Sequence, residues 1–84
     1  MKKYKFWNDP GHGWLEVTRK ELEELNIANK ISSYSYLSKD GKIVYLEEDC
    51  DAGVFIKAAK ITKDDIIYKY QENIFVRRLS NYKI

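Results

Sequence analysis

The chain has 84 residues, enough for one domain with a small core. Apolar residues make up 44% and aromatic residues 14% of the sequence, which is enough for a folded core and argues against intrinsic disorder. The formal net charge is only +2, which does not by itself indicate a nucleic-acid-binding domain, for which a concentrated basic face is expected. It contains no apolar run of membrane-spanning length, and its single cysteine excludes an internal disulfide and a Cys-rich zinc site. We therefore expect a reduced cytoplasmic protein.

Two β-hairpins are predicted in the first half of the chain. The first turns at Asp9-Pro10-Gly11, where Asp accepts nearby backbone hydrogen bonds, Pro fixes φ and Gly tolerates positive φ. The second turns at Asp40-Gly41, which lies between two alternating runs and is a strong hairpin signal. The expected strands are residues 3–7, 14–17, 31–37 and 43–46.

Two short helices are predicted next to these hairpins. Thr18 and Glu21 have the spacing of a capping box, which predicts a helix that ends near residue 26. Asp49 or Asp51 is expected to cap a second helix, whose apolar stripe is Ala52, Phe55, Ile56 and Ala59.

A final strand pair is expected at residues 66–71 and 75–79, with a helix over 66–70 as the alternative. Residues 1–84 then form a single α+β domain in the order β-β-α-β-β-α-β-β. Its sheet is expected to be mostly antiparallel and to carry two short helices.

The stretch FWNDPGHGWLEV, residues 6–17, holds one residue that turn chemistry does not explain. Asp9, Pro10, Gly11 and Gly13 all suit a tight connection between strands. A turn has no need of an imidazole, so His12 is a candidate recognition contact on an exposed loop. Gly11-His12-Gly13 is too short for a phosphate-binding signature.

Four of the five residues 47–51 are acidic, and no basic residue lies among them. Their spacing fails as a calcium loop, because the glycine comes one residue early and no closing glutamate follows. We therefore expect no metal and no cofactor. A compact surface rich in aromatic residues, with a focused charge patch, favours partner binding. The candidate partner-binding residues are His12, Trp14, Tyr34, Tyr36, Glu47, Glu48, Asp49 and Asp51.

Two alternatives stay open from the residues alone. One is a small hydrolase, metal-dependent or using a Cys/His pair, in which His12 works with Cys50, Asp49 or Asp51 and must lie within reach of them. The nearby carboxylates oppose a Cys50 thiolate, so no catalytic residue is assigned. The other is weak nucleic-acid binding by a basic, aromatic surface at the C-terminal strands. Its residues are Tyr68, Tyr70, Arg77 and Arg78.

The strings GHGW (residues 11–14) and YLEEDCDA (residues 45–52) resemble those of a family of short proteins encoded in bacteriophage and prophage genomes. The resemblance covers nearly the whole chain. It implies a small accessory protein in the cytoplasm of a bacterial host, with a host or phage protein as its partner. The function expected is non-enzymatic binding, including inhibition of a host defence nuclease, by a monomer or a small homo-oligomer.

Overall fold

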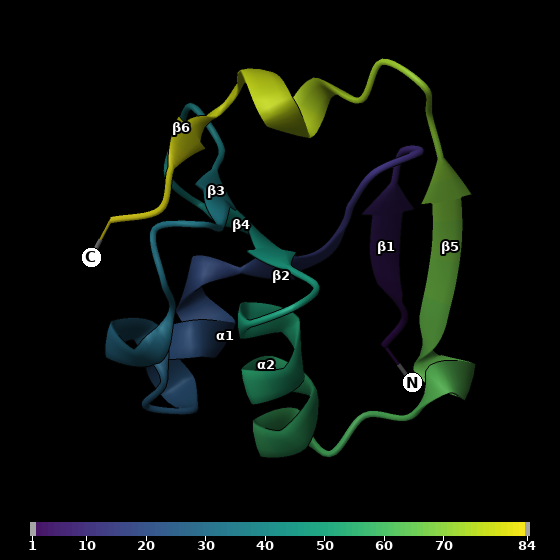
Figure 1. Ribbon diagram of the computed structural model, residues 1–84. Helices are drawn as coiled ribbons and strands as arrows, with labels where there is room; N and C mark the ends of the chain where they lie inside the picture. The colour runs from purple at the N-terminus through teal and green to yellow at the C-terminus, as the bar shows by residue number, and fades with distance from the viewer. Residues whose placement is uncertain (1, 84) are drawn as a thin grey trace.

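The computed structural model describes residues 2–83 and shows an α+β fold with one mixed sheet (Figure 1). The sheet order is β5-β1-β2-β4-β3-β6; β1 and β5 are parallel and the other neighbours are antiparallel. The strands are β1 (Tyr4–Asn8), β2 (Gly13–Thr18), β3 (Tyr36–Leu37), β4 (Ile43–Glu47), β5 (Ile66–Tyr70) and β6 (Ser80–Asn81). The helices are α1 (Arg19–Glu24) and α2 (Asp51–Ala59), with three short 3-10 helices, η1 (Ala28–Lys30), η2 (Lys63–Asp65) and η3 (Phe75–Arg78).

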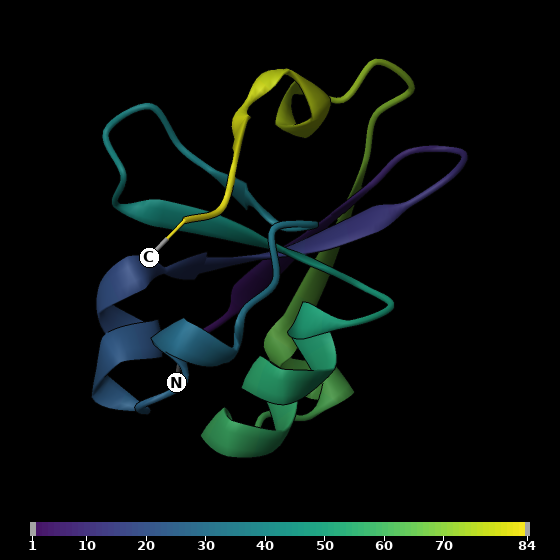
Figure 2. The ribbon, with the colours of Figure 1, turned by 60° about the vertical axis from the view of Figure 1, so that its left-hand side comes forward.

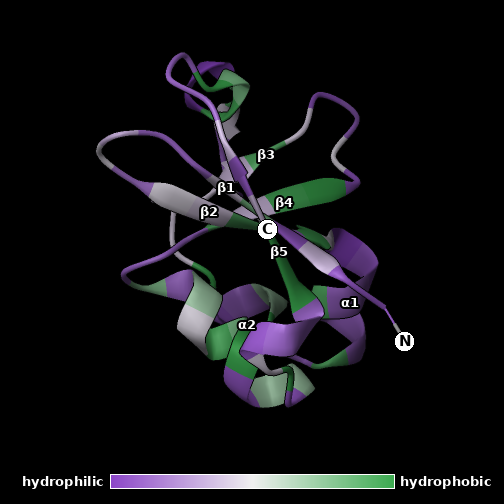
Figure 3. Cartoon of the chain, turned by 90° about the vertical axis from the view of Figure 1, so that its right-hand side faces the viewer, coloured by the Kyte–Doolittle hydropathy of each residue, from purple (hydrophilic) through white to green (hydrophobic). Residues whose placement is uncertain are grey.

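One face of the sheet is covered by α1 and α2, which both lie on the same side in Figures 1 and 2. Leu15 pairs with Leu46 across β2 and β4, and both side chains are fully buried with Phe55 of α2. Figure 3 shows β4 as a largely hydrophobic strand in the middle of the sheet. This face therefore holds the larger core, which is mostly aliphatic and also buries the rings of Tyr4, Phe55 and Tyr82.

The opposite face is covered by the C-terminal segment with η3 (Figure 2). Trp14 and Tyr45 project from this side of the sheet, because they alternate with the core residues of β2 and β4. Ile74 and Val76 pack against them and are buried. The second face is therefore aromatic.

Local sequence explains the first hairpin and the first helix. Asp9 Oδ1 accepts hydrogen bonds from the amides of Gly11 (2.9 Å) and His12 (2.8 Å), which closes the turn between β1 and β2. Gly13 lies directly under the Phe6 ring, where an added Cβ would stand 2.3 Å from a ring carbon. Thr18 and Glu21 form the expected capping box, with the Glu21 amide donating to Thr18 Oγ1 at 3.1 Å.

Three expectations about local structure are wrong. Residues 75–78 form η3 rather than a strand, and β5 pairs with β1 instead of with the segment that follows it. The strand expected at 31–37 is limited to Tyr36–Leu37, because residues 32–35 turn to meet α2. Neither Asp49 nor Asp51 caps α2, whose N-cap is Cys50 without a side-chain hydrogen bond.

Candidate functional site

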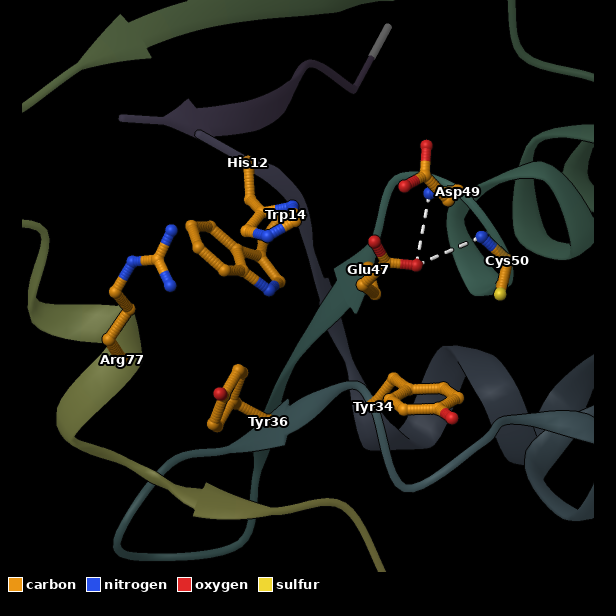
Figure 4. A pocket seen from close by; sticks show the side chains of 8 residues that line it. All are labelled: His12, Trp14, Tyr34, Tyr36, Glu47, Asp49, Cys50 and Arg77. Atoms are coloured by element: carbon orange, nitrogen blue, oxygen red, sulfur yellow. Dashed lines mark hydrogen bonds between the residues drawn. The ribbon is translucent and has the colours of Figure 1, made fainter. Parts of the chain in front are cut away.

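A hollow of about 320 Å³ lies on the aromatic face, between the β1–β2 loop, the segment before β3, the end of β4 and η3 (Figure 4). These segments are far apart in the chain, and the sheet register brings them together. The lining residues are His12, Trp14, Tyr34, Tyr36, Glu47, Asp49, Cys50 and Arg77.

Trp14 supplies an unused hydrogen-bond donor in this hollow. Its side chain is buried, with 2% exposed, and its indole N–H has no partner among the described residues. In Figure 4 the indole nitrogen points toward the space between Glu47, Tyr34 and Tyr36. A buried donor without a partner costs about 1–3 kcal/mol, so it is rare unless something else satisfies it.

Trp7 shows the ordinary arrangement beside it. It pairs with Trp14 across β1 and β2 and therefore lies on the same face. Its indole N–H donates to Glu16 Oε1 at 2.9 Å, and its ring packs edge-on against Phe75. The two tryptophans thus differ at the indole N–H: that of Trp7 is bonded to Glu16, and that of Trp14 has no acceptor among the described residues.

Arg77 braces the loop that carries His12. Its guanidinium binds the Asp9 carboxylate through both Nε and Nη2, the latter at 3.2 Å from Oδ1, and lies 5.2 Å from the centre of the Trp14 ring. The bond from Arg77 holds the pKa of Asp9 well below its usual range. A loop fixed at its base in this way presents His12 in a defined position.

Carboxylates form the opposite rim. Glu47 Oε1 accepts hydrogen bonds from the amides of Asp49 and Cys50, both at 3.0 Å, which orients the Glu47 side chain. His12, Glu47 and Asp49 each offer a ligand atom, and these three atoms lie within 4.8 Å of one another. His12 therefore lies near Asp49, as the metal-dependent alternative assumes, and that alternative stays a prediction.

Cys50 lines the same hollow as an exposed thiol. Local burial, followed by the charges of Glu47 and Asp51, raises its pKa. The thiolate, which is the nucleophilic form, is therefore disfavoured, as the acidic sequence around it indicated.

Asp51 is not available at the surface, since only 3% of it is exposed. Its carboxylate accepts hydrogen bonds from the Ser32 amide, from Ser32 Oγ at 2.7 Å and from Ser35 Oγ at 2.5 Å. It therefore fixes the segment that carries Tyr34, which is itself 69% exposed. Glu48 is exposed and lies with His12 beside a second, shallower hollow around the β1–β2 loop.

The four residues of the nucleic-acid alternative do not form one strand-built platform. Tyr68 packs against Phe6, whereas Arg77 packs against Trp14, and these two side chains project from opposite faces of the sheet. Tyr70 is exposed on β5 and Arg78 is exposed on η3. Tyr68 and Arg77 therefore do not share one face of the sheet, and weak nucleic-acid binding stays a prediction from the sequence.

Sequence reasoning missed the place of Arg77 in this hollow and the role of the serines that bind Asp51. The closeness of His12 to Asp49, by contrast, could have been predicted from the pairing of β2 with β4. In the antiparallel pair of β2 and β4, Trp14 lies opposite Glu47, and extending that register by two residues places His12 opposite Asp49.

Comparison with protein-family models, curated protein sequences and solved structures finds no match to this chain. The resemblance to short phage-encoded proteins therefore stays a prediction from the sequence. Among residues 2–83, no helix combines the length and apolar content that crossing a bilayer requires.

Proposed function

We propose that this chain is a non-enzymatic binding protein whose aromatic hollow receives a segment of a partner protein. The observation that carries the proposal is the buried indole N–H of Trp14, which has no acceptor among the described residues and points into the hollow. A peptide carbonyl is the commonest acceptor that a partner protein brings to such a donor.

The rest of the surface selects the chemistry of that segment. Glu47 and Asp49 place carboxylates at the rim, and Glu48 adds an exposed carboxylate at the separate hollow beside the β1–β2 loop. Tyr34 and Tyr36 add aromatic faces that accept apolar or cationic side chains. The combination fits an extended peptide segment that carries arginine or lysine.

The partner that we infer is a host or phage protein in the bacterial cytoplasm, bound by a monomer or a small homo-oligomer. A defence nuclease fits this chemistry, because its nucleic-acid channel is basic and the acidic rim would occupy it. The phage context comes from the sequence resemblance, and the preference for a basic partner comes from the charges around the hollow.

Affinity capture from phage-infected bacteria tests the proposal with a matched set of variants. The wild-type chain, Trp14→Phe, Asp49→Lys and the control Asp64→Lys are used as bait, and bound proteins are identified by mass spectrometry. Asp64 is an exposed acid on η2, outside the residues that line the hollow. We expect a partner that the wild type and Asp64→Lys retain and the other two lose. Equal capture by all four baits would contradict the proposal.

A small hydrolase is the second candidate, favoured only by the closeness of His12 to Glu47 and Asp49. Since the Cys50 thiolate is disfavoured, such an enzyme would depend on a bound metal. Hydrolysis of a phosphodiester substrate that requires added zinc and is lost in His12→Gln would support this candidate over simple binding.

A further inference from the structure

We propose that His12, Glu47 and Asp49 form a binding site for a divalent transition-metal ion such as zinc, at the rim of the aromatic hollow. The proposal goes beyond partner binding, because the three donors belong to this chain and need no second protein. They combine one imidazole with two carboxylates, and their ligand atoms lie within 4.8 Å of one another.

The separation of the donors is close to what a metal needs. Zinc binds nitrogen and oxygen ligands at about 2.0–2.2 Å, so two ligands of one ion lie about 3–4 Å apart. His12 and Asp49 are exposed, so small rotations about their side-chain bonds close the difference. The backbone already holds them face to face, since the Glu48 amide donates to the Gly13 carbonyl at 3.0 Å between them.

Glu47 is oriented in advance for this role. One carboxylate oxygen is held by the amides of Asp49 and Cys50, which leaves Oε2 without a partner among the described side chains. Hydrogen bonds to the second oxygen of a ligating carboxylate are the usual way in which proteins fix such a ligand.

A second observation points to a bound group in the same hollow. The Trp14 N–H is buried, lacks an acceptor among the described residues and is directed into the space beside Glu47 (Figure 4). Three protein ligands leave a zinc ion with an open position, which water or an anion fills. An oxygen atom in the space beside Glu47, whether a metal-bound water or a peptide carbonyl, is the kind of acceptor that Trp14 lacks.

The donor set selects the class of metal. Calcium takes six to eight oxygen ligands and magnesium keeps several waters, so neither gains from an imidazole. Imidazole with carboxylates suits zinc, cobalt, nickel and manganese, and two carboxylates balance the charge of a divalent ion. Arg77 does not oppose the ion with a free charge, because its guanidinium is paired with Asp9.

The most direct experiment uses the fact that His12 is the sole histidine of the chain. Long-range ¹H–¹⁵N correlation spectra of the labelled full chain, recorded during titration with zinc chloride, report the imidazole nitrogens of this one residue. We expect one ring nitrogen to shift strongly and to saturate at one equivalent of zinc. An imidazole that stays unchanged at saturating zinc would overturn the proposal without any variant being needed.

Calorimetric titration then identifies the other ligands. We expect His12→Gln and Asp49→Asn each to weaken zinc binding at least about tenfold. Glu48→Gln, the neighbouring exposed acid, and Cys50→Ser, which removes the thiol, are expected to change it less than about twofold. Loss of binding in Cys50→Ser with retention in His12→Gln would contradict the site. If the chain binds zinc but captures no partner, only the proposed function is contradicted. If it captures a partner but binds no zinc, only the metal site is contradicted.

Discussion

The two faces of the sheet are built on different principles. The face under α1 and α2 is mostly aliphatic, with Leu15, Leu46 and Phe55 fully buried. Its buried tyrosine hydroxyls are satisfied inside the chain, since Tyr4 donates to Glu21 and Tyr82 donates to the Ala28 carbonyl. The face under η3 is aromatic and carries an ion pair, a cluster of carboxylates and a tryptophan whose N–H has no partner among the described residues. We infer that the first face supplies most of the free energy of folding. The second face is less stable in itself, because the buried Trp14 N–H lacks an acceptor among the described residues, and we infer that this donor serves binding.

The largest expected effect lies on the aliphatic face. Phe55→Ala should lower the free energy of unfolding by about 3–5 kcal/mol, because it opens a cavity beneath both helices that the sheet cannot fill. Urea unfolding followed by circular dichroism measures this change. A loss below about 1 kcal/mol would show that this face does not dominate stability.

A smaller loss of stability is expected at Asp51, which ties the start of α2 to the segment before β3. Asp51→Ala should cost about 1–3 kcal/mol, since it leaves the buried Ser35 donor and the half-buried Ser32 donors without their acceptor. The matched control is Asp49→Ala, whose carboxylate is exposed and should cost less than about 0.5 kcal/mol. If the two variants unfold at the same urea concentration, the structural role assigned to Asp51 is wrong.

The acid response should reveal the ion pair that braces the β1–β2 loop. Asp9 has a folded-state pKa below its unfolded value of about 3.9, so its contribution is present above that pH and is lost as the pH falls further. Asp9→Asn should therefore flatten the decline of stability below about pH 4. Because Arg77 is 46% exposed, added salt should weaken the effect. An identical acid profile for wild type and Asp9→Asn would count against this brace.

The smallest expected stability effect concerns the helix start. Thr18→Ala should cost about 1 kcal/mol, because the Glu21 amide loses its acceptor in the capping box. Thr62→Ala, in the similar cap of η2 on an exposed segment, is the matched comparison and should cost less. Equal losses for the two threonines in thermal unfolding would show that α1 gains nothing from its tertiary position.

Features encoded by neighbours in the chain were predictable from sequence. The capping box of Thr18 and the turn at Asp9 depend on residues three apart or fewer, and both are present as expected. The α+β class followed from the same local patterns.

Features decided by distant pairing were not predictable. The segment at Phe75 has strand-like composition, yet it pairs with no strand among residues 2–83 and instead packs as η3 over Trp7 and Tyr45. Asp51 has the spacing of a cap, but serines 16 and 19 residues away take its carboxylate. The candidate site likewise needed the register of β2 against β4, which brings His12 to Asp49.

We infer that the indole N–H of Trp14, which has no partner among the described residues, marks a binding site for a basic peptide segment. Trp7 is an internal control, because its N–H is already bonded to Glu16. The measurement is a ¹H–¹⁵N spectrum of the two indole groups, assigned with Trp7→Phe, during titration with a capped peptide of alternating arginine and proline. We predict that the Trp14 signal shifts and saturates while the Trp7 signal stays in place. A peptide that leaves the Trp14 signal unmoved at saturating concentration, or that shifts only the Trp7 signal, would contradict the account.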